Sequence, residues 1–147
     1  PLENTYAVAD HLRCLAFMFG DGITPSNEGG GYLSRLVLRR TLRLMEDLGL
    51  DVPLTELMKM ELDQLGSSFP QLEEKRDYIL EVVDLEEDRY RNTLEEGKRL
   101  VGRLSASLKK EGKSRIGDDK LIELYDSHGL PPEVVEEVAE DEGVEVE

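Results

Sequence analysis

The sequence predicts an all-α fold: a helical bundle of two lobes that contains one long, coiled-coil-like helix. Three observations support this prediction. Leucine and glutamate are the most frequent residues, whereas aromatic residues make up 5% of the chain and tryptophan is absent. Apolar residues recur at helical spacing, and glycine or proline separates the periodic stretches. A length of 147 residues suffices for one domain with a core, or for two small helical lobes.

The first expected helix begins at a cap formed by Asn4 or Thr5 and ends at Gly20. Its buried stripe consists of Val8, Leu12, Leu15 and Phe19. His11 lies off this stripe and has no ligand-type neighbours at metal spacing, so we favour a structural role over general-base chemistry. Cys14 is the one cysteine of the chain, and we expect a buried thiol in a reducing compartment.

A glycine-rich loop, residues 20–31, leads into the second expected helix, which runs from Tyr32 to about Leu48. Four arginines of this helix fall within an arc of roughly 140°, at about 100° per residue. They are Arg35, Arg39, Arg40 and Arg43. The arginine fork suits phosphate oxygens, and the Asn27 amide in the loop offers a donor and an acceptor to a base edge. The alternative is a helix whose arginines pair with the chain's many carboxylates.

Pro53 suits the first turn of a third helix, which Gly66 ends. The short connector that follows is the expected boundary between the lobes, near residues 66–71. One lobe then spans residues 1–66 and the other residues 71–147.

A long helix is expected to begin at Leu72. Its inward positions alternate between spacings of four and three residues, the heptad pattern of a helix that packs lengthwise against another. These positions are Ile79, Val83, Glu86, Tyr90, Leu94, Gly97, Val101, Leu104 and Leu108. Two of them interrupt the apolar seam: the glutamate is expected at its edge, and the glycine permits a close backbone approach.

The long helix ends in a glycine-containing stretch, residues 112–117, and a short helix follows. This helix carries Asp126 near its C-terminal end, just before Gly129, where the helix dipole does not favour a carboxylate. A last helix is expected to begin at Pro131–Pro132, and residues 144–147 are expected to be a frayed or truncated end.

The net charge of −15 argues at first against a nucleic-acid partner, but the charge is unevenly distributed. Residues 131–147 hold eight acidic side chains and no lysine or arginine, whereas residues 98–115 hold seven basic side chains and one acidic. Binding to phosphates depends on local basic density, so RNA binding with a strong salt dependence is compatible with the sequence. Candidates for a second contact with an RNA backbone are Lys109, Lys110, Lys113 and Arg115.

No apolar run reaches the roughly 18 residues that a membrane-spanning helix needs, and residues 1–20 lack the pattern of a secretory signal. We therefore expect a cytoplasmic protein with no membrane partner. The sequence has no GxxxxGK[ST] phosphate loop, no paired histidines and no Cys/His cluster. It predicts no catalytic residue and no metal site in this segment.

Several motifs, in order, resemble the signature of the alanyl-tRNA synthetases. Ala9–Arg13 resembles the ADH(I/L)R helix of the family, and residues 21–43 resemble its DG, PSNEGRGYVLRR and RR blocks. Residues 93–97 are similar to its TLxxG helix, and residues 124–131 to its LYDTYGFP motif. This ordered set covers most of residues 7–132 and is far more specific than one motif alone. Departures from the family pattern, as expected of an archaeal-type member, occur at Gly30, Leu36, His128 and Leu130.

The resemblance implies that the chain is the helical tRNA-recognition segment of an alanine–tRNA ligase, a class II aminoacyl-tRNA synthetase. It implies a catalytic domain that uses ATP and Mg, and an editing domain that holds Zn, elsewhere in the parent chain. The implied partner is the acceptor stem of tRNA(Ala), not DNA, with its G·U wobble at the third base pair. Asn27 and Asp126, by their motif positions, are implied to flank that pair while the four arginines hold the backbone.

A protein of another class is the alternative: an acidic, helical protein-interaction module. Its heptad seam would bind a partner helix, and its acidic C-terminal end would serve as a solubilising or docking face.

Overall fold

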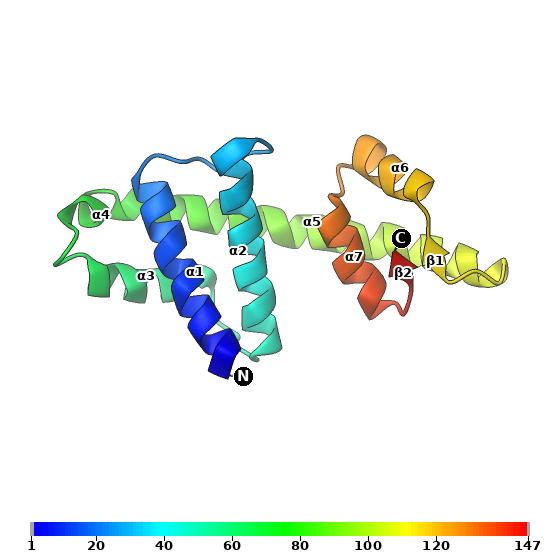
Figure 1. Ribbon diagram of the computed structural model, residues 1–147, viewed down its shortest axis with the longest axis horizontal. Coiled ribbons are helices and arrows are strands. Elements are labelled where there is room, and N and C mark those ends of the chain that lie inside the picture. The colour runs from blue at the N-terminus through cyan, green and yellow to red at the C-terminus, as the bar shows by residue number, and fades with distance from the viewer. Residues whose placement is uncertain (1, 147) are drawn as a thin grey trace. The chain divides into compact units, whose positions relative to one another are not determined.

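The computed structural model describes residues 2–146, and these residues are almost entirely helical (Figure 1). The prediction of an all-α fold is confirmed. The helices are α1 (Leu2–Gly20), α2 (Gly29–Asp47), α3 (Leu54–Leu65), α4 (Pro70–Glu74), α5 (Arg76–Lys110), α6 (Asp118–His128) and α7 (Pro132–Asp141). Two short strands, β1 (Arg115–Ile116) and β2 (Glu145–Val146), complete the described elements.

The chain divides into two compact units, Pro1–Arg89 and Tyr90–Glu147, and the division falls within α5. The sequence predicts the lobe boundary elsewhere, near residues 66–71. That stretch lies inside the first unit, where α4 contacts both α1 and α3 and Leu72 is buried. Most of the connector itself is exposed, but the helix that follows it packs against α1 and α3, which keeps this stretch within the first unit.

Glycine residues mark the C-terminal ends of several helices, as the sequence predicts. Gly49, after α2, and Gly129, after α6, adopt positive φ angles of 73° and 66°, the left-handed conformation that glycine favours at the end of a helix. The beginnings differ more from expectation. α1 already begins at Leu2, so the predicted cap at Asn4 or Thr5 is wrong, and the first turn of α2 begins at Gly29, ahead of Tyr32.

The core of the first unit lies where α1 packs against α2 and α3. The predicted stripe of α1 is confirmed: all four of its residues, Val8, Leu12, Leu15 and Phe19, are buried. Gly20 meets α4 closely, since a Cβ at this position would lie 2.6 Å from Leu72 Cδ2. The expectation of a buried Cys14 is wrong, because this thiol lies on the exposed side of α1, 3.7 Å from Met18 Sδ.

The long helix begins at Arg76, not at Leu72, because the chain first forms the short α4 and then leaves helical geometry at Lys75 (φ −96°, ψ 6°). Most of the predicted seam is buried, including Ile79, Val83, Tyr90, Gly97 and Val101. The other apolar positions of the seam, Leu94, Leu104 and Leu108, are half-buried.

In the second unit, α7 packs across the glycine of the seam. A Cβ at Gly97 would lie 3.3 Å from Val134 Cγ1 and 3.5 Å from Val138 Cγ2. The phenol of Tyr90 donates a hydrogen bond of 2.5 Å to Glu137 Oε2. Glycine at position 97 thus permits the close helix approach that the sequence predicts.

The C-terminal residues are ordered by a two-stranded parallel pairing of β1 with β2, in the register Arg115 with Glu145 and Ile116 with Val146. Ile116 is fully buried and Val144 is 5% exposed. The expectation of a frayed end is wrong for residues 144–146, because these apolar side chains anchor the strand. Residue 147 lies outside the described residues.

Within residues 2–146, the helices offer no stretch that is both long and apolar enough to cross a membrane.

We predict that Gly97→Leu lowers the free energy of unfolding by about 1–3 kcal/mol, because the new side chain must push α7 away from α5. Gly102 is the matched control: it lies in the same helix, and nothing stands within 4 Å of an added Cβ. Gly102→Leu should raise the free energy by about 0.5–1 kcal/mol through helix propensity. Urea unfolding measures both, and an equal loss in the two variants would contradict the packing argument.

Candidate nucleic-acid interface

The loop before α2 is held in shape by its own polar groups. The Ser26 hydroxyl donates to the Glu28 carbonyl oxygen (3.1 Å) and accepts from the Glu28 backbone N–H (3.3 Å). Gly31 allows this loop to lie against the helix, since a Cβ there would collide with Ser26 Oγ and with the Thr24 carbonyl oxygen. Asn27 lies between the two hydrogen-bonded residues and is exposed. The loop therefore presents one amide side chain on a fixed backbone.

Arg35 connects this loop to the long helix. Its Nε donates to Glu86 Oε2 (3.1 Å) and its Nη2 donates to Glu86 Oε1 (2.9 Å), which is a bidentate ion pair. Its Nη1 donates to Asn27 Oδ1 at 2.7 Å. The ion pair is buried, with 6% of the Arg35 side chain and 10% of the Glu86 side chain exposed. One guanidinium thus binds a carboxylate from α5 and the amide of the loop.

The expectation of an exposed row of four arginines is wrong for two of them. Burial decreases across the arc: Arg35 (5% exposed) and Arg39 (9%) are buried, Arg43 is half-buried, and Arg40 is exposed. At about 100° per residue, Arg35 and Arg39 overlap the stripe of α2 that contains Leu38 and packs into the core. The alternative, in which arginines pair with carboxylates, holds for Arg35.

Glu86 is the residue of this site that the sequence does not identify. The heptad spacing places it inward, whereas its charge favours a position at the edge of the seam. A charged residue at a core position requires a partner, because an unpaired buried charge is costly. That mismatch is the signal by which Glu86 can be recognised, although the sequence alone does not say which of the arginines it binds.

Asp126 is exposed on α6 in the second unit, whereas Asn27 belongs to the first unit. The basic residues predicted to make a second RNA contact are exposed at the end of α5 and in the segment after it: Lys109, Lys110, Lys113 and Arg115. Acidic side chains lie among them: Lys113 Nζ is 3.4 Å from Glu111 Oε2, and Arg115 Nε is 3.2 Å from Glu145 Oε2. This segment also borders an open cavity of about 770 Å³ that Asp118 and Asp119 help to line. The local surface is therefore mixed in charge.

His11 lies near the exposed end of the arginine arc. Burial lowers the pKa of His11, and the nearby positive charge of Arg40 lowers it further, while Asp10 opposes the shift. Its Nδ1 atom is buried and has no hydrogen-bond partner among residues 2–146. Both effects disfavour the protonated form of His11, which fits the structural role expected for it.

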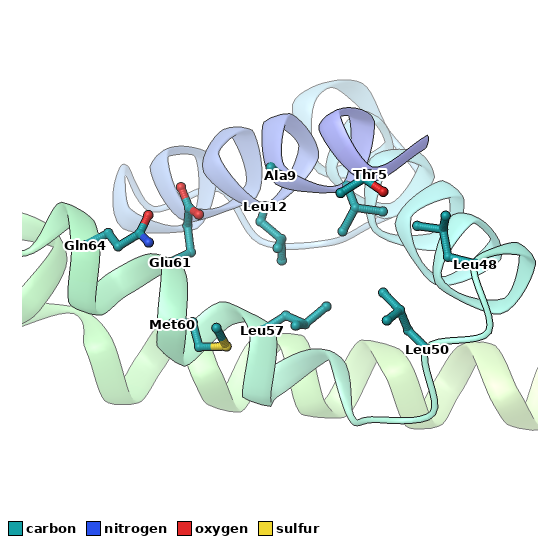
Figure 2. A pocket seen from close by; sticks show the side chains of 10 residues that line it. Thr5, Ala9, Leu12, Leu48, Leu50, Leu57, Met60, Glu61 and Gln64 are labelled. Carbon is teal, nitrogen blue, oxygen red and sulfur yellow. The ribbon is translucent and has the colours of Figure 1, made fainter. Parts of the chain in front are cut away.

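A second cavity of about 410 Å³ lies in the first unit between α1, α3 and the chain that joins α2 to α3. Figure 2 shows Leu12 of α1 and Leu57 of α3 extending toward one another across it, with Leu48 and Leu50 at one end. Glu61 lies at the other end, and burial raises the pKa of its carboxyl group, with a smaller opposing effect of Arg13. The cavity is lined mainly by apolar side chains.

The family described as tRNA synthetases class II (A) matches residues 2–147. The chain belongs to this family. Alanine–tRNA ligase of Methanosphaera stadtmanae is 50% identical to it over 141 residues, or 96% of this chain. Alanine–tRNA ligases of Methanothermobacter thermautotrophicus and Pyrococcus abyssi are 47% and 49% identical over 146 residues, or 99% of this chain.

The resemblance to the alanyl-tRNA synthetases is therefore confirmed, and the relatives come from archaea, as the departures from the family pattern suggest. The chain spans 16% of the length of each of these ligases. Among residues 2–146 of this class II (A) synthetase segment, no group of three or more His, Cys, Asp or Glu side chains is arranged to hold a metal ion.

Glu61, which lines the apolar cavity, should make the stability of the chain depend on pH. Because the folded state raises the pKa of Glu61 above its ordinary value of 4.5, the unfolded chain releases this proton first as the pH rises. The stability contribution of the group is therefore present at low pH and is lost as the pH rises through the folded-state pKa. Glu61→Gln should increase the melting temperature at pH 7, and the gain over the original chain should vanish near pH 4.

Glu56→Gln is the matched control, since Glu56 lies on the same helix but is exposed and pairs with Lys59 at 3.2 Å. This variant should show no gain at pH 7. A gain of equal size in both variants would attribute the effect to net charge and not to burial of Glu61.

Proposed function

We propose that this chain is the part of an alanine–tRNA ligase that binds the acceptor stem of tRNA(Ala) and recognises the G·U wobble at its third base pair. The observation that carries the proposal is the exposed Asn27 amide, which the Arg35 guanidinium holds at 2.7 Å on a loop with the family motif. The identity to alanine–tRNA ligases along nearly the whole chain supports it. Aminoacylation itself belongs, in this proposal, to the rest of the ligase.

The chemistry of the wobble pair suits these side chains. In RNA the shallow minor groove exposes base edges to a protein, and a wobble leaves the exocyclic amine of guanine without a partner there. The Asp126 carboxylate can accept from that amine, and Asn27 offers its Nδ2 donors and the second lone pair of Oδ1. With an ordinary base pair these groups remain unsatisfied, which costs about 1–3 kcal/mol for each buried group.

We assign contacts with the RNA backbone to those basic side chains that are exposed or half-buried. Arg40 and Arg43 lie at the accessible end of the arginine arc and can reach phosphates, whereas Arg35 and Arg39 are buried. The exposed basic residues at and beyond the end of α5 supply the second backbone contact. These contacts hold the stem without reading its sequence. In this proposal the catalytic domain, with ATP and Mg, and the editing domain, with Zn, lie elsewhere in the ligase.

Asn27→Ala and Asp126→Ala should each reduce the preference of the chain for a G·U over a G·C acceptor hairpin by about 1–3 kcal/mol, because each removes a partner of the wobble pair. Titration of both hairpins at one fixed salt concentration measures the preference. Asn92→Ala and Asp88→Ala are the controls, since both residues are exposed on α5 outside the family motifs. An unchanged preference in both test variants would refute the assignment.

Arg40→Ala should behave differently, because a phosphate contact carries no sequence information. It should weaken binding of both hairpins by the same factor and reduce the slope of log K against log salt by about 0.7–0.9. Lys59→Ala, which removes an exposed cation of α3, should leave this slope unchanged. A loss confined to one hairpin would contradict a phosphate role for Arg40.

A further inference from the structure

We propose that Glu86 and Arg35 are positioning residues that fix the orientation of the Asn27 amide, and that recognition of the third base pair depends on this buried ion pair. The inference rests on the proposed function. It adds Glu86 to the determinants of specificity, although Glu86 lies on α5 beneath the loop contact and its carboxylate is almost entirely buried.

The contact between Arg35 and Asn27 can form in only one orientation of the amide. An asparagine amide can turn over about its last torsion, which exchanges its carbonyl oxygen with its NH₂ group. A guanidinium carries donors and no acceptor, so it can bind the carbonyl oxygen of the amide but not the NH₂ group. The hydrogen bond of 2.7 Å from Arg35 Nη1 to Asn27 Oδ1 therefore selects one of the two orientations. The Nδ2 donors face away from Arg35.

Glu86 directs the guanidinium of Arg35. The two carboxylate oxygens of Glu86 bind Nε and Nη2 of Arg35, which fixes the plane of the fork and leaves Nη1 for the amide. A buried guanidinium without its carboxylate is strongly unfavourable and will turn toward solvent or another partner. Without Glu86, therefore, Arg35 no longer holds the Asn27 amide in one orientation.

This role of Glu86 can be separated from general packing of α5. Glu87 is the next residue of the same helix, is also buried (5% exposed), and accepts a hydrogen bond of 3.1 Å from the Leu54 backbone N–H at the start of α3. It supports the first unit but has no hydrogen bond to Asn27. Glu87→Gln is therefore a matched control for Glu86→Gln, with the same change in charge and volume at a neighbouring buried site.

The first measurement is ¹⁵N relaxation of the Asn27 side-chain NH₂ group in the free 147-residue chain. In Glu86→Gln the order parameter of this group should fall below about 0.6, the range of flexible groups. In the unsubstituted chain and in Glu87→Gln it should stay high. An Asn27 amide that remains equally ordered in Glu86→Gln overturns the positioning role, whatever the RNA measurements show.

The second measurement is the ratio of affinities for G·U and G·C acceptor hairpins. Glu86→Gln should lower this ratio by about fivefold or more, toward the ratio of Asn27→Ala, while Glu87→Gln leaves it unchanged. Suppose that Asn27→Ala lowers the affinity ratio, but Glu86→Gln makes the Asn27 amide mobile without changing that ratio. This result would show that the orientation of the amide is irrelevant to recognition. If Asn27→Ala itself leaves the ratio unchanged, the proposed function fails, and the relaxation data still decide whether Glu86 positions the amide.

A double variant guards against loss of the fold. Arg35→Met combined with Glu86→Leu replaces the buried pair by apolar side chains of similar size, a change that proteins often tolerate. The chain should remain helical by circular dichroism, and the Asn27 amide should be mobile because it no longer has the hydrogen bond from Arg35. The ratio of G·U to G·C affinities should fall as much as in Glu86→Gln. A folded double variant with an ordered amide and an unchanged ratio would overturn the proposal.

Discussion

A buried ion pair between Arg35 of α2 and Glu86 of α5 constrains the first unit. Both charges are removed from water, so each is stable only in the presence of the other, and loss of one partner of such a pair costs about 3–5 kcal/mol. The pair joins two helices that are 51 positions apart in sequence, and the remaining N–H group of the guanidinium extends the link to the loop. The contact that joins α2 to α5 therefore also reaches the candidate recognition site.

Features that are set locally could be predicted from the sequence. The positions of the helices follow from glycine and proline, and the apolar stripe of α1 follows from helical spacing, because both depend on residues within a few turns. The close approach at Gly97 was also predictable, since a glycine in an otherwise apolar seam leaves room for a neighbouring helix. The loop carrying Asn27 was identified from its glycines and its motif.

Features that depend on distant contacts could not be predicted. Helical spacing places the four arginines on one arc but does not show which end of the arc faces the core, so the burial of Arg35 and Arg39 was missed. The same limit explains Cys14, whose exposure depends on how α1 packs against its neighbours. The pairing of β1 with β2 joins residues far apart in sequence. Each strand is also too short to leave a periodic signal in the sequence.

The burial of two arginines has a consequence for how this segment can act on RNA. It reduces the positive charge exposed on a chain whose net charge is −15, so in the proposed function we expect non-specific attraction to a stem to be weak. One of those arginines instead fixes the amide that, in the proposed function, reads the base pair. Such a segment contributes more to discrimination than to affinity. In the proposed function this division of labour suits a chain that spans 16% of its relatives' length, because other parts of the ligase would hold the RNA and present the stem at a high effective concentration.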